Sequence, residues 1–341
     1  MNKNNFDFLR FLFALLVVMG HSYVLSGNGE SMEIISLISN KQLSLTSIGL
    51  NGFFVISGYL IFKSLMNSDT IKGYYWRRVL RLYPGLLVVL LLTIFLSPFL
   101  YESEIPFLKN KDVYTYLPNN LSLYKIQYSI KGVLTKNTYH RAINGSLWTI
   151  CYEFTLYLLL SVLIFFRSNI KIVRALLFVI FTMMYIGYNF YFDYLSEINF
   201  IGLEGKHFLN LGNFFICGSL LSSFQIEKMN YKKIGLGFIF FIFIISIYFE
   251  VYNLLKHILF TLLILLIALN PINKICKFGE IGDLSYGIYI YSFPIQQILM
   301  YFFKFNGKQL LLTSVVLSVL FGFFSWHLIE KKAMNYKGVI S

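Results

Sequence analysis

The chain has 341 residues, a formal net charge of +13, and a composition that is 57% hydrophobic and 13% charged. Together with a mean hydropathy of +0.66, this composition is too apolar for a soluble domain and predicts an integral membrane protein. The basic residues lie in short clusters between apolar runs, where they set membrane topology, so we expect no nucleic-acid partner. The three cysteines have no metal-ligand spacing, so we expect neither a metal site nor a disulfide framework.

Apolar runs of about 20 residues, the length that crosses a bilayer, recur along the chain and predict an all-α bundle of about ten transmembrane helices. The predicted helices are 7–25, 46–65, 83–100, 146–166, 172–191, 206–224, 234–250, 254–270, 284–303 and 309–329. The first reaches Leu25 without a small-residue cleavage pattern, so we interpret it as a retained helix and not a signal peptide. We interpret residues 1–341 as a single transmembrane domain without internal repeats or an appended soluble domain.

Lysines and arginines follow the second, fourth, sixth, eighth and tenth predicted helices, and Lys3 precedes the first. The positive-inside rule makes this side of the membrane cytoplasmic and predicts that both termini are cytoplasmic. The longest connection, at about 101–145, is then extracytoplasmic. This loop is too long for a bare connection, so we expect a binding role. Its tyrosines either offer aromatic faces to a sugar of the acceptor or are membrane-interface residues.

The first helix contains two polar residues that lipid disfavours, Arg10 and His21. Because an α-helix turns about 100° per residue, their separation of eleven positions places them on one face, roughly 16 Å apart along the axis. Arg10 is either a snorkelling anchor at the cytoplasmic end or part of a site. His21, if buried, is neutral and able to accept a proton; the alternative is a hydrogen-bonded packing histidine.

The fourth helix enters the membrane from the outside and places Glu153 about 12 Å below Gly145. An isolated carboxylate at that depth needs a partner or protonates. His21 lies in the same outer half of the membrane, so a His21–Glu153 pair, in which the carboxylate orients the imidazole, is sterically allowed.

Three arginines in YYWRRVLRLYP, Arg77, Arg78 and Arg81, stand at the cytoplasmic start of the third helix. They either set topology or bind an anion, because Arg78 and Arg81 share a helix face and guanidinium groups fit phosphate oxygens. A phosphate-rich cytoplasmic donor such as a coenzyme A thioester would suit this cluster.

Two further segments mix small, polar and aromatic residues. In GLNGFFVISGYLIF, with Asn51 and Ser57, close helix packing is the main interpretation, and a role for Ser57 in lining a channel is the alternative. In LSYGIYIYSFPIQQ, Ser292 and Pro294 lie near mid-membrane, where the segment either lines a polar path or forms a kinked packing helix. We interpret His140, His207, His257 and His327 as interface or packing residues.

Together these segments resemble the acyltransferase 3 family, multi-span membrane proteins that O-acylate bacterial surface polysaccharides. The resemblance covers essentially the whole chain. It rests on Arg10 with His21, GLNGFFVISGYLIF, the Arg78–Arg81 pair, SLWTICYEFTLY and LSYGIYIYSFPIQQ, in the family's order.

The resemblance implies a membrane O-acyltransferase of the bacterial cytoplasmic (inner) membrane. It implies that acetyl from cytoplasmic acetyl-CoA reaches a sugar hydroxyl of a polysaccharide or lipid-linked glycan at the outer face. The expected catalytic residues are His21 and Glu153. We expect the donor to contact Arg10, Arg77, Arg78 and Arg81, and the substrate to contact Trp148, Asn51, Ser57 and Ser292.

Three positions depart from the family pattern, which often has Asp at Asn51, Glu at Phe154 and His at Ser292. These departures leave His21 and Glu153 as the main candidates for handling protons. Two other classes stay open: a transporter or exporter of a glycan, and a non-catalytic assembly partner. A transporter would more often show inverted repeats with broken helices in matched halves, which the sequence lacks.

Overall fold

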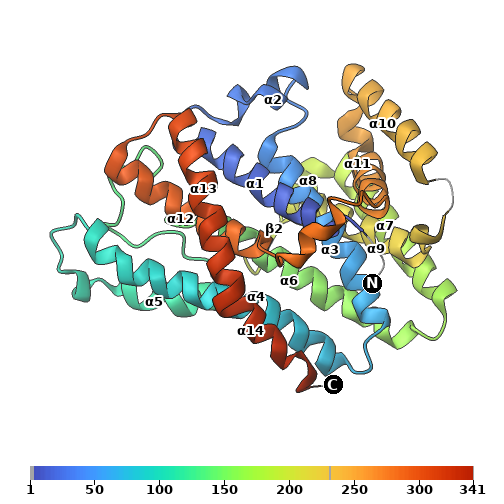
Figure 1. Ribbon diagram of the computed structural model, residues 1–341, viewed down its shortest axis with the longest axis horizontal. Coiled ribbons are helices and arrows are strands. Elements are labelled where there is room, and N and C mark those ends of the chain that lie inside the picture. The colour runs from blue at the N-terminus through green and yellow to red at the C-terminus, as the bar shows by residue number, and fades with distance from the viewer. Residues whose placement is uncertain (1–3, 230–231, 341) are drawn as a thin grey trace.

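The computed structural model describes residues 4–229 and 232–340, which are almost entirely helical (Figure 1). The long helices are α1 (Phe6–Leu25), α3 (Leu45–Met66), α4 (Ile71–Leu96), α5 (Lys111–Leu121), α6 (Trp148–Ser161), α7 (Ile170–Phe190), α9 (Gly205–Ser223), α10 (Lys232–Tyr248), α11 (Tyr252–Leu269), α12 (Ser285–Phe303) and α13 (Gly307–Ser325). Short helices connect them: α2 (Ile34–Ile38), α8 (Phe192–Ser196), α14 (Lys331–Met334), the π-helical η8 (Trp326–Glu330), and the 3₁₀ segments η1 (Glu30–Met32), η2 (Ser97–Leu100), η3 (Phe107–Lys109), η4 (Gly145–Leu147), η5 (Val162–Phe166), η6 (Ile226–Lys228), η7 (Cys276–Glu280) and η9 (Asn335–Gly338). The strands β1 (Asn199–Phe200) and β2 (Leu203–Glu204) pair antiparallel.

Seven stretches of the described chain are long and apolar enough to cross a membrane. They are Phe6–Leu25, Leu45–Met66, Ile71–Leu100, Gly145–Phe166, Ile170–Phe190, Tyr252–Leu269 and Gly307–Gly338. All ten predicted ranges fall on helices, but α9, α10 and α12 are not among the seven stretches. Helix α10 has only 17 residues, and polar side chains lower the mean hydropathy of α9 and α12. The chain is therefore a helical protein with several membrane-spanning segments, while the count of ten and the cytoplasmic placement of the termini stay predictions.

Helix α4 begins about three turns before the predicted third span. The hydroxyl of Thr70 accepts a hydrogen bond from the Gly73 amide at 3.0 Å and caps the helix there. The helix then continues through Pro84 to Leu96. The arginines of YYWRRVLRLYP consequently lie on the helix itself and not at its start.

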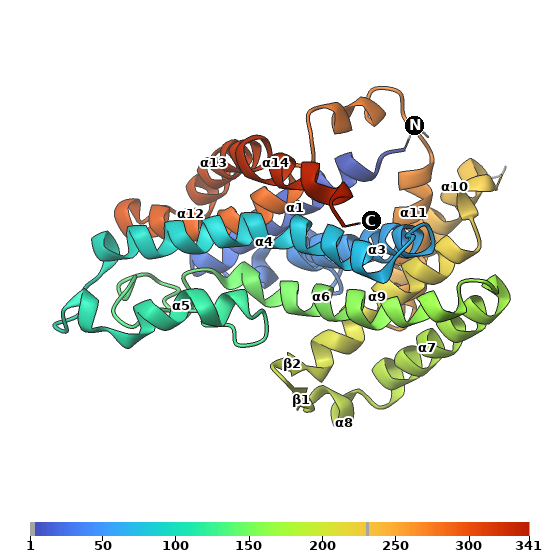
Figure 2. The ribbon, with the colours of Figure 1, turned by 90° about the horizontal axis from the view of Figure 1, so that it is seen from below.

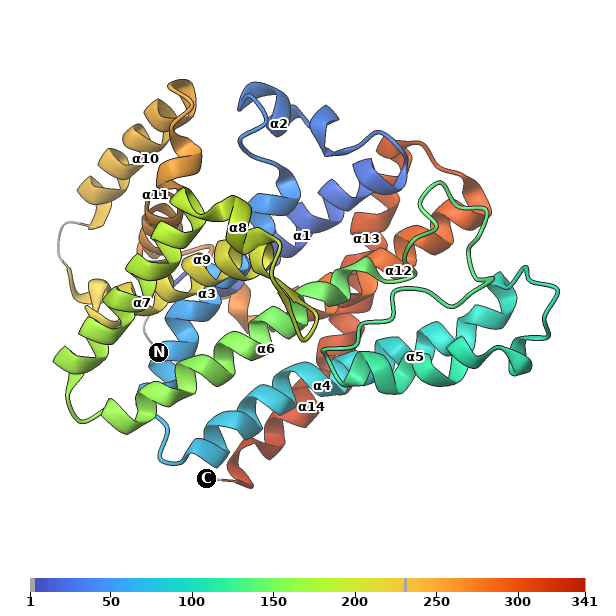
Figure 3. The ribbon, with the colours of Figure 1, turned by 180° about the vertical axis from the view of Figure 1, so that it is seen from behind.

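Helix α3 lies at the centre of the bundle and packs against α1, α9, α11 and α6. Glycines set its distance from α9: a Cβ at Gly58 would lie 2.0 Å from the Phe215 carbonyl oxygen, and one at Gly218 would lie 2.5 Å from that of Val55. The interpretation of GLNGFFVISGYLIF as a close-packing segment is confirmed at Gly58. Figure 3 shows α6, which contacts α3, passing in front of it.

The predicted outer loop is folded. Its helix α5 lies alongside α4 (Figure 2). Further along, the Asn137 amide donates to the Gln297 side chain of α12 at 2.7 Å, and Gln297 donates to the Tyr139 carbonyl at 2.7 Å. These hydrogen bonds fix the second half of the loop over α12, next to a cavity of about 450 Å³.

Candidate active site

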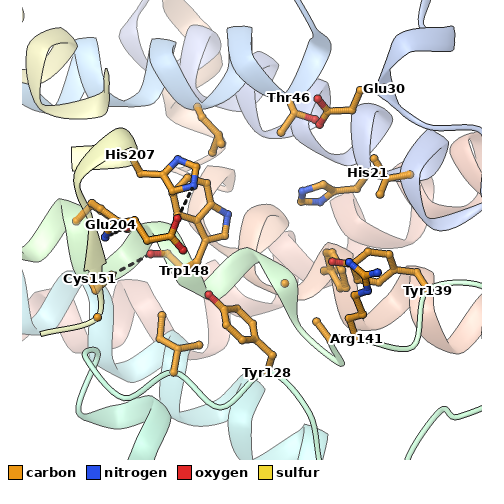
Figure 4. A pocket seen from close by; sticks show the side chains of 18 residues that line it. His21, Glu30, Thr46, Tyr128, Tyr139, Arg141, Trp148, Cys151, Glu204 and His207 are labelled. Carbon is orange, nitrogen blue, oxygen red and sulfur yellow. Dashed lines mark hydrogen bonds and ion pairs between the residues drawn. The ribbon is translucent and has the colours of Figure 1, made fainter. Parts of the chain in front are cut away.

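A cavity with a volume of about 450 Å³, called the outer cavity below, is lined by residues of α1, α3, α6, α9, α12 and the outer loop. Figure 4 shows His21 on one side of this outer cavity and Trp148, Glu204 and His207 on the other. Tyr139 and the other loop residues Ile126, Tyr128, Arg141 and Ala142 also line it. A cavity of this size is in the range that holds small ligands.

His21 reaches the outer cavity from the last turns of α1. Its Nδ1 has no hydrogen-bond partner among the described residues. The ring packs against the edge of Phe293 of α12, with centroids 5.2 Å apart and planes at 77°. The aromatic contact therefore holds the imidazole, and no hydrogen bond among the described residues fixes its buried Nδ1.

The opposite wall is aromatic and carries charge at its rim. The Trp148 ring lies 4.4 Å from that of His207, and His207 Nε2 lies 3.8 Å from the Glu204 carboxylate. Glu204 and His207 are not among the predicted site residues. His207 was interpreted as an interface or packing residue, and the structure adds that it lines the outer cavity. The placement of Glu204 and His207 depends on the β1–β2 hairpin, in which Ile201 and Gly202 both have positive φ. A hairpin with strands of only two residues has too little alternation of polar and apolar residues to be predicted from the sequence.

A second, inner cavity of about 280 Å³ brings together all four predicted donor-binding arginines. Its lining includes Arg10, Arg77, Arg78 and Arg81. The sequence placed three of them on one segment and the fourth on another, and the folded chain gathers them in one place.

Two of these arginines are neutralised by carboxylates. Asp283 forms ion pairs with Arg10 at 2.7 Å and Arg81 at 2.6 Å. Arg81 also lies 3.4 Å from Glu330, a fully buried carboxylate that accepts a hydrogen bond from Ser325 at 2.8 Å. Burial raises the pKa of Asp283, but the two arginines and the hydrogen bonds from the following turn lower it to about 2. Sequence reasoning missed both carboxylates, although Asp283 immediately precedes the LSYGIYIY segment.

The other two arginines have no such partner: among the described residues, neither Arg77 nor Arg78 forms an ion pair with a carboxylate. Arg78 donates to Ser64 Oγ at 2.7 Å, and its guanidinium lies 5.3 Å from the centre of the Tyr74 ring. Its Nε is buried without a hydrogen-bond partner in the described structure. The arginine charge that no ion pair neutralises therefore lies at Arg77 and Arg78, in the same lining as Glu153, and an anion would be stabilised beside these two guanidinium groups.

The predicted pair of His21 and Glu153 does not form a hydrogen bond. Glu153 accepts hydrogen bonds from Ser57 at 2.9 Å and from Tyr157, and it lines the inner cavity. The reason is depth and direction: Glu153 lies five residues, about 8 Å, further along α6 than Trp148 and points toward α3. Ser57 thus lines the inner cavity, and its alternative role in lining a channel stays a prediction.

A narrow middle cavity of about 40 Å³ lies between the other two. It shares Leu50 with the outer cavity and shares Arg10, Glu153 and Tyr286 with the inner one. This volume has room for water but not for a larger group. The three cavities therefore follow one another from the arginines to His21, with a constriction in the middle.

Two predicted substrate-binding residues lie outside these three cavities. Asn51 is buried and accepts a hydrogen bond from Asn210 at 3.2 Å, so it joins α3 to α9. Ser292 is fully buried and donates to the Tyr289 carbonyl of its own helix at 3.1 Å. In this structure neither side chain is exposed to a ligand, because each bonds within the bundle. The remaining two do line cavities: Trp148 lines the outer one and Ser57 lines the inner one.

The fold and these cavities define a multi-span membrane protein with a histidine-bearing outer chamber and an arginine-bearing inner chamber. The chain belongs to the acyltransferase 3 family: the family described as an acyltransferase domain matches residues 3–329. It is similar to an O-acetyl transferase of Shigella phage Sf6, with 27% identity over 339 residues that cover 98% of this chain and 97% of that protein. It is also similar to nodulation protein 10 of Rhizobium leguminosarum bv. viciae, with 26% identity over 168 residues, 48% of this chain and 44% of that protein. No solved structure shows a significant match. The protein is thus an acyltransferase.

Proposed function

We propose that the protein transfers acetyl from cytoplasmic acetyl-CoA to a sugar hydroxyl of a surface polysaccharide or its lipid-linked precursor, in the bacterial cytoplasmic membrane. The observation that carries this proposal is the series of three cavities that joins Arg78 to His21 through shared residues. The donor binds at the inner end and the acceptor at the outer end.

The donor assignment rests on charge. The nucleotide part of coenzyme A carries several phosphates, and Arg77 and Arg78 supply guanidinium groups without a carboxylate partner among the described residues. The flexible arm of the coenzyme then extends past Glu153 toward the constriction. Because the middle cavity holds only about 40 Å³, side chains around it must move for the thioester to pass. A short acyl group suits this passage, and the relative from Shigella phage Sf6 is described as an O-acetyl transferase.

The acceptor assignment rests on the outer cavity, where Trp148 and several tyrosines offer faces for a sugar ring and polar groups surround the rim. Membrane topology supports the same direction of transfer, since the positive-inside rule places the arginine end in the cytoplasm.

The chemistry proposed for His21 balances without a further reactant. The imidazole takes the proton of the sugar hydroxyl as the oxygen attacks the thioester carbonyl. The carbon–sulfur bond breaks, and the departing thiolate takes the proton back from the imidazolium. An acyl-enzyme step on His21 is the variant of this route. Glu153, bonded to Ser57 and Tyr157, then acts on the donor side of the constriction and not on the imidazole.

Mass spectrometry of surface glycan from cells with and without the gene tests the proposal. We expect the glycan to lose the mass of one acetyl group per modified sugar when the gene is deleted, and a His21→Asn variant at normal membrane levels to behave like the deletion. Full modification by His21→Asn would contradict the catalytic role. Unacylated glycan retained inside the cell would instead indicate the exporter.

A further inference from the structure

A proline opens the hydrogen-bond ladder of α12 beside the outer cavity. Pro294 has no N–H, so the Ile290 carbonyl loses its usual donor four residues later. Ile290 is fully buried, and a buried carbonyl without a donor is costly. The Asn144 side chain supplies the missing donor: its Nδ2 lies 2.9 Å from the Ile290 oxygen.

The same side chain begins the segment that carries Trp148. Asn144 is 1% exposed, and its Oδ1 accepts a hydrogen bond from the Ser146 amide at 3.1 Å, which caps η4 directly before α6. The amide group of Asn144 therefore donates to α12 and accepts from η4, the turn that leads directly into α6, and so joins two walls of the outer cavity.

This bridge places Phe293 between the loop and His21. A Cβ on Gly145 would lie 2.6 Å from the Phe293 ring, so glycine permits the close approach of the two segments. On its other side, Phe293 packs edge-on against His21, with centroids 5.2 Å apart. Tyr139 of the outer loop packs against Phe293 as well, with centroids 6.0 Å apart.

A second anchor fixes α12 to the helix that carries His21. Gln296 is fully buried and donates to the Val18 carbonyl at 2.8 Å and to Ser22 Oγ at 2.9 Å. Val18 and Ser22 flank His21 on α1. Along α12, the hydrogen bond to α1 is therefore at Gln296, three residues after Phe293, and the hydrogen bond to the loop is at Ile290, three residues before Phe293.

We propose that Asn144 is a positioning residue for acyl transfer, which fixes the orientation of the His21 ring through the Ile290 carbonyl and Phe293. The proposal rests on the proposed role of His21. Because His21 Nδ1 has no hydrogen-bond partner among the described residues, packing against Phe293 sets the ring's orientation. The Asn144–Ile290 bond determines where Phe293 lies.

A double-mutant cycle between Asn144 and Pro294 tests this role. Asn144→Ala leaves the Ile290 carbonyl without a donor, whereas Pro294→Ala restores a helical N–H that reaches the same carbonyl. In membrane vesicles supplied with radiolabelled acetyl-CoA and glycan from the deletion strain, we expect Asn144→Ala to lower kcat about tenfold. The KM for acetyl-CoA stays within about twofold, since a misoriented base slows the chemical step without weakening donor binding. In the Pro294→Ala background the same change costs less than about threefold, because the carbonyl keeps a partner.

Asn144→Ser separates the two hydrogen bonds of Asn144. The serine hydroxyl still accepts from the Ser146 amide and caps η4, but the serine side chain is too short to donate to the Ile290 carbonyl. It should lower kcat as Asn144→Ala does. Asn110→Ala is the matched control: Asn110 caps α5 in the same loop and donates to the Lys131 carbonyl, so its loss should leave kcat unchanged.

Equal losses from Asn144→Ala in both backgrounds, or a wild-type kcat for Asn144→Ser, would overturn the proposal. The cycle is also measured on melting temperature in detergent, which does not depend on catalysis. Full activity of His21→Asn together with an intact thermal coupling would reject the catalytic role of His21, and with it the positioning role of Asn144, but leave the structural bridge. If the effects of Asn144→Ala and Pro294→Ala on the melting temperature are simply additive, the hydrogen bond between Asn144 and the Ile290 carbonyl does not contribute to the fold, and the bridge is rejected.

Discussion

Asp283 and Arg81 form an ion pair of 2.6 Å, and this pair divides the arginines of the inner cavity into two kinds. Arg81 and its neighbour Arg10 have their charge matched by Asp283 and Glu330. Arg77 and Arg78 lack such partners among the described residues. The four residues that sequence motifs group together as a donor site therefore have different physical roles, and substitutions should separate them.

Replacing Arg78 should weaken donor binding without unfolding the protein. A hydrogen bond to a charged group is worth about 1.5–3 kcal/mol, so Arg78→Gln should raise the Kd for acetyl-CoA about 10- to 100-fold. Titration of acetyl-CoA into the detergent-solubilised protein measures this. A donor without nucleotide phosphates, acetyl-pantetheine, is the decisive comparison: its binding should change little, and an equal loss would contradict a phosphate contact.

A matched control comes from the same side of the protein. Arg174 donates to the Ser223 carbonyl at 2.7 Å and lines none of the three cavities. Arg174→Gln should leave the Kd for acetyl-CoA unchanged.

Arg81→Gln should differ from Arg78→Gln and Arg174→Gln by lowering the stability of the protein, since removing one member of a buried ion pair costs about 3–5 kcal/mol of stability. Its melting temperature should fall well below that of Arg78→Gln.

The stability of the protein should depend on Asp283 in acid. The folded pKa of this carboxyl is lowered to about 2 from an ordinary value of 3.8. A lowered pKa contributes stability above the unfolded value, and this contribution is lost as the pH falls from about 4 to about 2. We expect the melting temperature of the wild type to drop across that interval, and the drop to be smaller in Asp283→Asn. Parallel curves for the two proteins would contradict the assignment, because other carboxyl groups such as Glu102 titrate equally in both.

The constriction should select the length of the acyl group. Phe53 lines the middle cavity and packs against Tyr289, with ring centroids 6.0 Å apart. Phe53→Ala removes this ring and widens the passage, so propionyl and butyryl donors should gain in rate relative to acetyl, by about 10-fold for an added methylene. Relative kcat/KM values for the three coenzyme A thioesters measure the change. Phe13, which packs against Phe53 but lines none of the three cavities, supplies the control: Phe13→Leu should keep the original preference.

The helices of this fold could be predicted because membrane-length apolar runs are a property of the local sequence. Partners of side chains are not: nothing in one sequence shows that Glu153 points toward Ser57 and Tyr157 while His21 meets Phe293. The arginines were predictable from residue type, but the neutralisation of Arg81 by Asp283 and Glu330 joins residues about 200 and 250 positions apart. The charge balance of a site therefore needs the folded chain.

Trp148 should contribute to acceptor binding alone. Its indole lines the outer cavity. If its contact with a sugar face is worth as much as a contact between aromatic rings, about 0.5–1.5 kcal/mol, Trp148→Ala should raise the KM for the glycan about 2- to 13-fold. The slow release of free coenzyme A from acetyl-CoA without glycan reports the donor half of the reaction, and it should not change. Trp76, whose Nε1 donates to the Tyr336 carbonyl at the opposite end of the bundle, is the control, and Trp76→Ala should keep the wild-type KM for the glycan. Equal losses of glycan transfer and acceptor-free release in Trp148→Ala would mean that the indole supports the fold of the cavity and does not bind the sugar.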